Sequence, residues 1–276
     1  MAFPAMAVRN RVDSLFQRCA QEKRSALVLY LTSGFPDAAT TRRLLPVLAK
    51  SGCDLIELGV PFSDPIADGP IIQRSSTVAL GAGMTLPITL DILKEFRAGH
   101  DTPVILFGAL NPYLARGLEH SADLAADAGA DGILAADLPH EEAAEFSAIL
   151  RERGLHLITL VAPTTPDDRF ATIAADSTGF LYCIAMKGTT GQLSGVTAAS
   201  AGYLARLRRN TNLPLALGFG ISKPEHVRAA VEAGADGVVV GSSLITLVEE
   251  TIARKGDLDG VVSDYVRGLA SELKRR

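Results

Sequence analysis

One short joint between a helical pattern and a strand pattern occurs three times in the chain. It reads SGCD at residues 51–54 and AGAD at both 128–131 and 233–236. In each copy a helical pattern ends, a glycine supplies the left-handed conformation that closes a helix, and a short aliphatic strand begins after the aspartate. Joints of this kind that recur through a chain are typical of alternating β and α units.

Eight strands are predicted from short, almost continuous apolar runs, which are the pattern of strands covered on both faces. They are Leu27–Thr32, Leu55–Leu58, Val104–Phe107, Gly132–Ala135, His156–Val161, Phe180–Ile184, Leu215–Leu217 and Gly237–Val240. Amphipathic helical patterns are found at Thr40–Lys50, Leu118–Ala128, Glu141–Arg153, Asp167–Ala175, Ala198–Arg209, Pro224–Ala233 and Leu244–Ala253. This alternation predicts the α/β class and one (β/α)8 TIM barrel, as a single domain over residues 1–276.

Three helical pieces are expected outside the eight units. A short amphipathic helix opens the chain, with apolar residues at helical spacing from Val12 to Cys19. A helical insertion around Gln73–Arg97 follows the second strand, and a C-terminal helix follows Asp257. An open, doubly wound sheet is the alternative architecture, because alternation alone does not show that a sheet closes.

Composition and charge exclude several classes of protein. The chain has 276 residues, with 47% hydrophobic and 21% charged residues, which argues against disorder. The net charge of −4 gives no attraction to nucleic acid or to anionic membranes. Three scattered cysteines and five scattered histidines match no zinc spacing, so no metal site is expected. The absence of a long apolar stretch or a signal pattern predicts a soluble, cytoplasmic protein.

The segment LIELGVPFSDPIADGP, residues 55–70, places a carboxylate inside an apolar strand and two more in the loop that follows. Two of them have ordinary structural explanations: an ion pair at a strand end for Glu57, and a turn before Gly69 for Asp68. Catalytic groups of barrels, however, lie at the C-terminal ends of strands and in the following loops. Glu57 and Asp68 together therefore predict general acid–base chemistry, because burial raises the pKa of a glutamate toward neutrality.

Glycine-rich turns follow the sixth, seventh and eighth predicted strands, at 188–191, 218–220 and 241–243. Glycine lets backbone N–H groups approach an anion closely, and a helix that starts after Gly241 would add its positive end. Three such turns at successive strand ends predict a phosphorylated substrate. Because no GxGxxG or Walker sequence opens a helix, no nucleotide cofactor is indicated.

These motifs resemble those of one family, the α subunit of tryptophan synthase. The segment at 55–70 looks like the signature of that family. Further similar stretches are TSGFPD (32–37), AGADGILAADLPHEEA (128–143), LVAPTTPDDR (160–169), GFGISKPEHV (218–227) and GADGVVVGSS (234–243). The resemblance implies a retro-aldol cleavage of indole-3-glycerol phosphate to indole and glyceraldehyde 3-phosphate, without a cofactor, in partnership with a pyridoxal-phosphate β subunit in an α2β2 heterotetramer.

The resemblance also implies roles for individual residues. Glu57 would be the main acid–base group at C3 of the indole ring, and Asp68 would accept the indole N–H. Substrate-binding positions carried over from the family are Tyr182, Thr190, Phe219 and Ile72, and phosphate-binding positions are Gly191, Gly220, Gly241 and Ser242. The sixth loop departs from the usual family pattern, since residues 182–191 read YCIAMKGTTG. Leu110 also stands where a tyrosine is common.

Three other functions remain open from the sequence alone. The altered sequence of the sixth loop is consistent with a stand-alone lyase that releases free indole. A non-catalytic partner that only activates a β subunit is less consistent with two intact carboxylates. A different phosphate-handling barrel enzyme, such as an isomerase or epimerase, is not excluded by the barrel itself.

Overall fold

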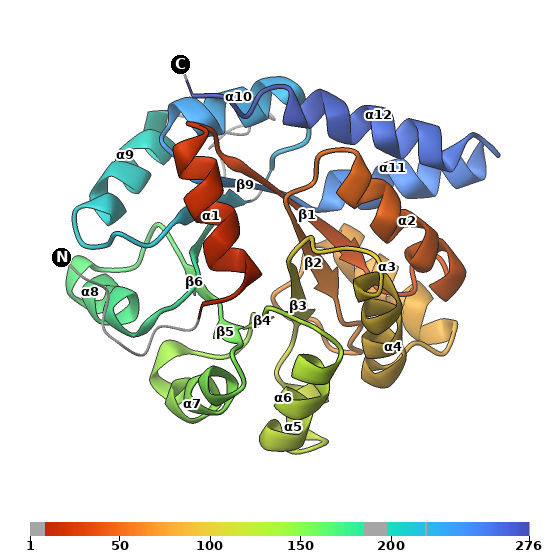
Figure 1. Cartoon of the computed structure of the whole chain (residues 1–276), viewed down its shortest axis with the longest axis horizontal. Helices are drawn as coiled ribbons and strands as arrows, with labels where there is room; N and C mark the ends of the chain where they lie inside the picture. Colours follow the sequence, from red (N-terminus) through yellow and green to blue (C-terminus); the bar gives the residue numbers. More distant parts are fainter. Residues whose placement is uncertain (1–8, 185–197, 219, 276) are drawn as a thin grey trace.

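The fold is a parallel sheet surrounded by helices (Figure 1), and the computed structural model describes residues 9–184, 198–218 and 220–275. Within these residues the strands are β1 (Ala26–Thr32), β2 (Leu55–Gly59), β3 (Val104–Gly108), β4 (Gly132–Ala135), β5 (His156–Leu157), β6 (Thr159–Val161), β7 (Leu181–Ile184), β8 (Leu215–Gly218) and β9 (Gly237–Val240). Their order is β5-β4-β3-β2-β1-β9-β8-β7-β6.

The two ends of this order belong to one extended segment of the chain. β5 pairs with β4, β6 pairs with β7, and both pairings are parallel. Between the two halves, the N–H of Ile158 donates to the carbonyl oxygen of Ile133 at 2.9 Å. The predicted fifth strand, His156–Val161, is thus divided because each half bonds to a different neighbour. The segment closes the sheet, which confirms the (β/α)8 barrel and rules out the open, doubly wound alternative.

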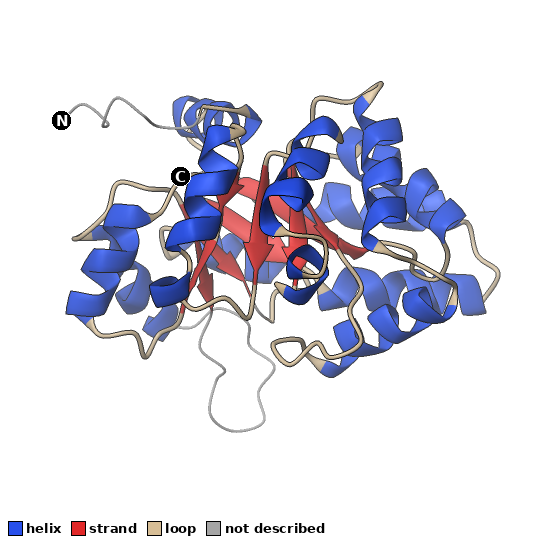
Figure 2. Cartoon of the chain, turned by 90° about the horizontal axis from the view of Figure 1, so that it is seen from below, coloured by secondary structure: helices blue, strands red, loops and turns tan. Residues whose placement is uncertain are grey.

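Helices surround the barrel on its outer side (Figure 2). In the described part of the chain they are α1 (Arg11–Gln21), α2 (Ala38–Lys50), α3 (Pro70–Gly81), α4 (Leu86–Arg97), α5 (Asn111–Leu114), α6 (Leu118–Asp127), the 3-10 helix η1 (His140–Glu142), α7 (Ala144–Glu152), α8 (Asp167–Asp176), α9 (Ala198–Arg208), α10 (Pro224–Glu232), α11 (Ser242–Ala253) and α12 (Leu258–Ala270). The expected N-terminal and C-terminal helices are α1 and α12.

Three details of the helices differ from the sequence-based expectation. The insertion after β2 is two helices, α3 and α4, which are bent by 96° at the break between them. Gly83 lies in this break with a φ of +83°, a conformation that ends a helix. The expected helix Glu141–Arg153 is the short turn η1 followed by α7, and α5 was not expected. No single described helix is both long and apolar enough to span a membrane, and α3 with α4 satisfies that test only as a bent pair.

The buried side chains form an outer and an inner core, because alternate residues of a strand face opposite sides of the sheet. On β2, Ile56 and Leu58 belong to the outer core beneath the helices, whereas Leu55 belongs to the core inside the barrel. Helix α1 crosses the N-terminal end of the barrel (Figure 1) and packs against that inner core. The rings of Phe16 and Phe180 lie 5.5 Å apart at this contact. One end of the barrel is therefore closed by α1.

The repeated joint has a structural reason in the fold. Its aspartates, Asp54, Asp131 and Asp236, precede β2, β4 and β9, and each one clamps the neighbouring strand that comes earlier in the chain. Each carboxylate accepts the N–H of one residue of that strand at 2.9 Å, namely Leu27, Val104 and Leu215 respectively. The backbone N–H of each aspartate donates to the carbonyl of the same residue, at 2.9, 2.8 and 2.8 Å. The joint thus sets the register of neighbouring strands.

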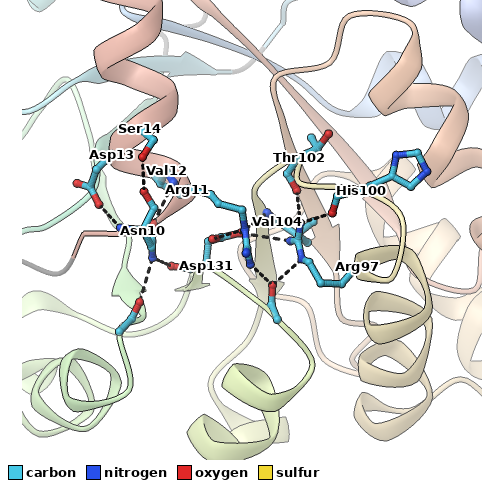
Figure 3. A network of polar contacts seen from close by, with 12 residues as sticks. Asn10, Arg11, Val12, Asp13, Ser14, Arg97, His100, Thr102, Val104 and Asp131 are labelled. Carbon is cyan, nitrogen blue, oxygen red and sulfur yellow. Dashed lines mark hydrogen bonds and ion pairs between the residues drawn. The ribbon is translucent and has the colours of Figure 1, made fainter.

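Asp131 also ties two helices to the barrel (Figure 3). Its side chain is only 1% exposed and lies 3.0 Å from Arg11 Nε of α1 and 3.3 Å from Arg97 Nη2 of α4. Asn10, which caps α1, donates to the carbonyl oxygen of Asp131 at 2.7 Å. This buried carboxylate therefore links α1, the insertion and the third and fourth strands.

We expect Asp131→Ala to lower the free energy of unfolding by about 3–5 kcal/mol, because it leaves buried donors and guanidinium groups without their partner. The matched control is Asp123→Ala. Asp123 pairs with Arg153 at 2.6 Å but its side chain is 56% exposed, so its loss should lower the stability far less than the loss of Asp131. Urea denaturation at neutral pH measures both values. Equal losses for the two variants would contradict the role assigned to Asp131.

Candidate active site

A cavity of about 360 Å³ opens at the C-terminal end of the barrel, opposite α1. Its walls are inward-facing residues of the strands, together with residues of α3 and of the segments that follow β2, β8 and β9. The structure brings seven of the predicted site residues to this one cavity: Glu57, Asp68, Ile72, Tyr182, Gly220, Gly241 and Ser242. The other three, Thr190, Gly191 and Phe219, lie outside the described residues.

Glu57 reaches the cavity because of the alternation along β2. Leu55, Glu57 and Gly59 share the inner face of the strand, and Leu55 is covered by the inner core while Glu57 lines the cavity. The carboxyl group is 1% exposed, and its Oε1 has no hydrogen-bond partner among the described residues. Burial raises the pKa of Glu57 to about 8. Glu57 therefore carries a proton at neutral pH.

Asp68 is held by the loop between β2 and α3. Its N–H donates to the carbonyl of Pro65 at 3.0 Å, and its carbonyl accepts from Gln73 Nε2 at 2.9 Å. Pro70 begins α3 directly after the loop. Burial raises the pKa of Asp68 to about 6, and the charge of Asp137 adds to this effect. Asp64, the other acid of the segment, is exposed and does not line the cavity.

The two carboxyl groups thus differ in charge at neutral pH. With pKa values of about 8 and about 6, Glu57 is mostly protonated at pH 7 and Asp68 is mostly ionised. One cavity therefore presents a proton donor and a fixed negative charge. This combination suits a reaction in which a proton is delivered to one atom while positive charge develops on another.

A second part of the cavity, beyond the ends of β8 and β9, can hold an anion. Gly241 precedes the twelve-residue helix α11, and no side chain of the described residues caps the first N–H groups of that helix. Ser242 is the first residue of the helix, and Gly220 lies nearby with a φ of +76°, a conformation that favours glycine. Free N–H groups and the positive helix end provide an anion site without a basic side chain.

The rest of the cavity is mainly apolar. Ile72 of α3, Leu160 of β6 and Ile184 of β7 contribute aliphatic walls. Tyr182 of β7 is 7% exposed, and burial raises the pKa of its hydroxyl well above the usual value, so the hydroxyl stays neutral. Space of this kind accommodates a flat aromatic group between apolar side chains.

Sequence reasoning missed Tyr30, which also lines the cavity. The available signal was a single tyrosine inside the otherwise aliphatic strand ALVLYLT. Within the described ranges, no group of three or more His, Cys, Asp or Glu side chains is arranged to hold a metal ion.

Comparisons with known proteins find one family along nearly the whole chain. The family model described as tryptophan synthase alpha chain matches residues 16–271. The tryptophan synthase alpha chain of Geobacter sulfurreducens is 45% identical over 264 residues, which cover 96% of this chain and 99% of that protein. The one from Caulobacter vibrioides is 45% identical over 268 residues, covering 97% and 96% of the two chains.

Solved structures show the same fold. Tryptophan synthase subunit alpha from Legionella pneumophila superposes with a TM-score of 0.89 at 35% identity, over 96% of this chain and 98% of that one. A chain from the tryptophan synthase α2β2 complex of Pyrococcus furiosus superposes with a TM-score of 0.84 at 40% identity, over 90% and 99%. With this fold, this site and these relatives, the chain belongs to the tryptophan synthase alpha chain family.

Proposed function

We propose that this chain cleaves indole-3-glycerol phosphate to indole and glyceraldehyde 3-phosphate, with Glu57 and Asp68 as its acid–base groups. The reaction of the family is this lyase cleavage, in tryptophan biosynthesis. The observation that supports our assignment most strongly is the cavity itself. It joins a protonated buried glutamate, an ionised aspartate and a helix N-terminus that suits a phosphate.

The chemistry divides between the two carboxyl groups. Glu57 delivers its proton to C3 of the indole ring, which makes the ring nitrogen positive. The Glu57 carboxylate then takes the proton from the hydroxyl on the adjacent chain carbon. As that oxygen becomes the aldehyde, the electron pair of the breaking C–C bond returns to the ring. Asp68 accepts the indole N–H and stabilises the transient positive charge.

This sequence of steps balances without a redox partner or a cofactor. One proton moves from the substrate hydroxyl to C3, and Glu57 returns to its starting state. The phosphate is held by backbone N–H groups at Gly220, Gly241 and Ser242, which fixes the chain relative to Glu57. Burial of Glu57 is what makes the step accessible at neutral pH, because an ordinary glutamate would carry no proton there.

We also propose the β subunit of tryptophan synthase as the partner, in an α2β2 assembly in the cytoplasm. The relative from Pyrococcus furiosus was solved in a complex of this composition. The sixth loop, whose sequence departs from the family pattern, lies within residues 185–197, outside the described part of the chain. A stand-alone lyase that releases free indole therefore stays the second outcome to be tested.

The test of the function is indole release by the purified chain, alone and with a pyridoxal-phosphate β subunit. Slow cleavage that rises sharply with the partner would support the α subunit of a complex. Fast cleavage that is indifferent to the partner would show a stand-alone indole producer. An absence of cleavage in both conditions would overturn the proposed function.

The pH dependence of cleavage tests the assignment of the two carboxyl groups. Asp68 must be ionised, so activity should rise through about pH 6, and Glu57 must be protonated, so activity should fall through about pH 8. We expect a bell-shaped profile of kcat/KM between these values. The alkaline limb is the diagnostic one, because the phosphate of the substrate itself titrates near pH ~6.

Glu57→Gln should reduce kcat by about 10²–10⁴-fold, the usual contribution of a general acid–base group. Glu95→Gln serves as the control, because Glu95 of α4 forms an exposed ion pair with Arg42 of α2. The control should keep both the rate and the alkaline limb of the pH profile. Full activity of Glu57→Gln would remove Glu57 from the mechanism.

Gly241→Asp should raise KM by about tenfold more than Gly241→Asn, because only the aspartate adds a negative charge beside the phosphate. The two side chains have nearly the same size. A Cβ at this position would make an ordinary contact, 3.4 Å from the Cβ of Tyr30, so neither variant is blocked sterically at that atom. Steady-state kinetics measure the difference, and equal KM values would place the phosphate elsewhere.

A further inference from the structure

Tyr30 has a fixed position between the two halves of the site. It lies on β1, which pairs with β2 on one side and with β9 on the other. Glu57 is its direct partner on β2, and its Cβ lies next to Gly241 at the end of β9. Tyr30 therefore stands between the proposed acid–base group and the proposed phosphate site. In the substrate, the glycerol chain is the part that joins the phosphate to the reacting bond.

The ring of Tyr30 is held on several sides. Phe107 of β3 meets it edge-on, with ring centroids 5.3 Å apart and an angle of 83° between the planes. The hydroxyl group lies over Gly59, where the methyl group of an alanine would overlap it. The side chain is 6% exposed, and burial keeps the hydroxyl neutral by raising its pKa. The Tyr30 ring is thus fixed by its neighbours, so its hydroxyl group keeps one position in the site.

A chain of hydroxyl groups leads to Tyr30. Ser75 Oγ of α3 lies 2.6 Å from Thr32 Oγ1, and Thr32 Oγ1 donates to the Tyr30 hydroxyl at 3.2 Å. Each hydroxyl carries one proton and can accept further hydrogen bonds. Ser75 Oγ also donates to the carbonyl oxygen of Ile72 at 2.8 Å, so its one proton is shared between two acceptors. In the arrangement in which Ser75 donates to Thr32 and Thr32 donates to Tyr30, the phenolic proton remains for an acceptor in the cavity. Successive donation in one direction strengthens each bond of such a chain.

We propose that Tyr30 is a further substrate-contacting residue, which donates a hydrogen bond to a hydroxyl oxygen of the glycerol chain and is held for that purpose by Thr32 and Ser75. The indole ring offers an N–H donor, and the phosphate oxygens are satisfied at the glycine-rich end. The chain hydroxyls are the acceptors that remain for Tyr30. The inference rests on the proposed function and adds to it a contact that selects a hydroxylated chain.

The test compares two ligands with Tyr30→Phe. This variant keeps the ring against Phe107 and removes only the hydroxyl group. For indole-3-glycerol phosphate, kcat/KM should fall by roughly tenfold, the effect of one lost hydrogen bond. The second ligand is an inhibitor in which a plain three-carbon chain joins indole to phosphate, so that both chain hydroxyls are missing. Its inhibition constant should stay unchanged.

Two further variants separate a specific contact from general damage. Thr32→Val removes the donor to Tyr30, so it should lower kcat/KM in the same direction, and the double variant should be no worse than Tyr30→Phe alone. Tyr203→Phe is the matched control, because that buried hydroxyl donates to the carbonyl of Val161 at 2.8 Å on the outer side of the barrel. It should leave kcat/KM unchanged.

The outcomes are distinct. An unchanged kcat/KM in Tyr30→Phe, or an equal loss of affinity for the inhibitor without hydroxyls, overturns the role of Tyr30 and leaves the proposed function intact. Absence of cleavage by the unmodified chain overturns the proposed function and this inference with it. A loss confined to the hydroxylated substrate supports the contact.

Discussion

The two-point clamp between each joint aspartate and its neighbouring strand is the interaction on which the rest of the architecture depends. A parallel strand that slips by one residue moves every inward side chain to the outside. The carboxylate and the backbone N–H of one aspartate both bind the same residue of the neighbouring strand that comes earlier in the chain. They therefore set the register at the N-terminal end of the barrel. Correct register there decides which side chains reach the cavity at the other end.

The two ends of the barrel differ in how they treat a buried carboxyl group, Asp131 at the N-terminal end and Glu57 at the C-terminal end. Burial raises the pKa of Asp131, but the N–H of Val104 and the charges of Arg11 and Arg97 oppose that effect and stabilise the ionised form. Burial acts on Glu57 without any such opposing group, and its pKa rises to about 8. One carboxylate thus holds helices and strands together, while the other keeps a proton. Both side chains are only 1% exposed, and the partners of Asp131 contribute to the difference between the two groups.

Much of the site could be predicted because its residues belong to local patterns. Glu57 stands out as a charge in an apolar strand, Gly241 and Ser242 directly follow β9, and Asp68 lies in the loop after β2, where barrels place their functional groups. Tyr30 escaped notice because a tyrosine in a buried strand has an ordinary packing explanation. Its position depends on Phe107, on the bare backbone of Gly59 and on Thr32, which come from three strands. No local pattern contains that combination.

The sequence by itself determined the alternation of strands and helices, the resemblance to the family, and the placement of Glu57 in the second strand and of Asp68 in the loop after it. These features depend on neighbours a few residues apart, which a periodic pattern records. Only the tertiary structure decided that the sheet closes, through the division of His156–Val161 between two partners, and that seven predicted residues share one cavity. It also decided the protonation of Glu57, because desolvation depends on everything that is packed around the carboxyl group.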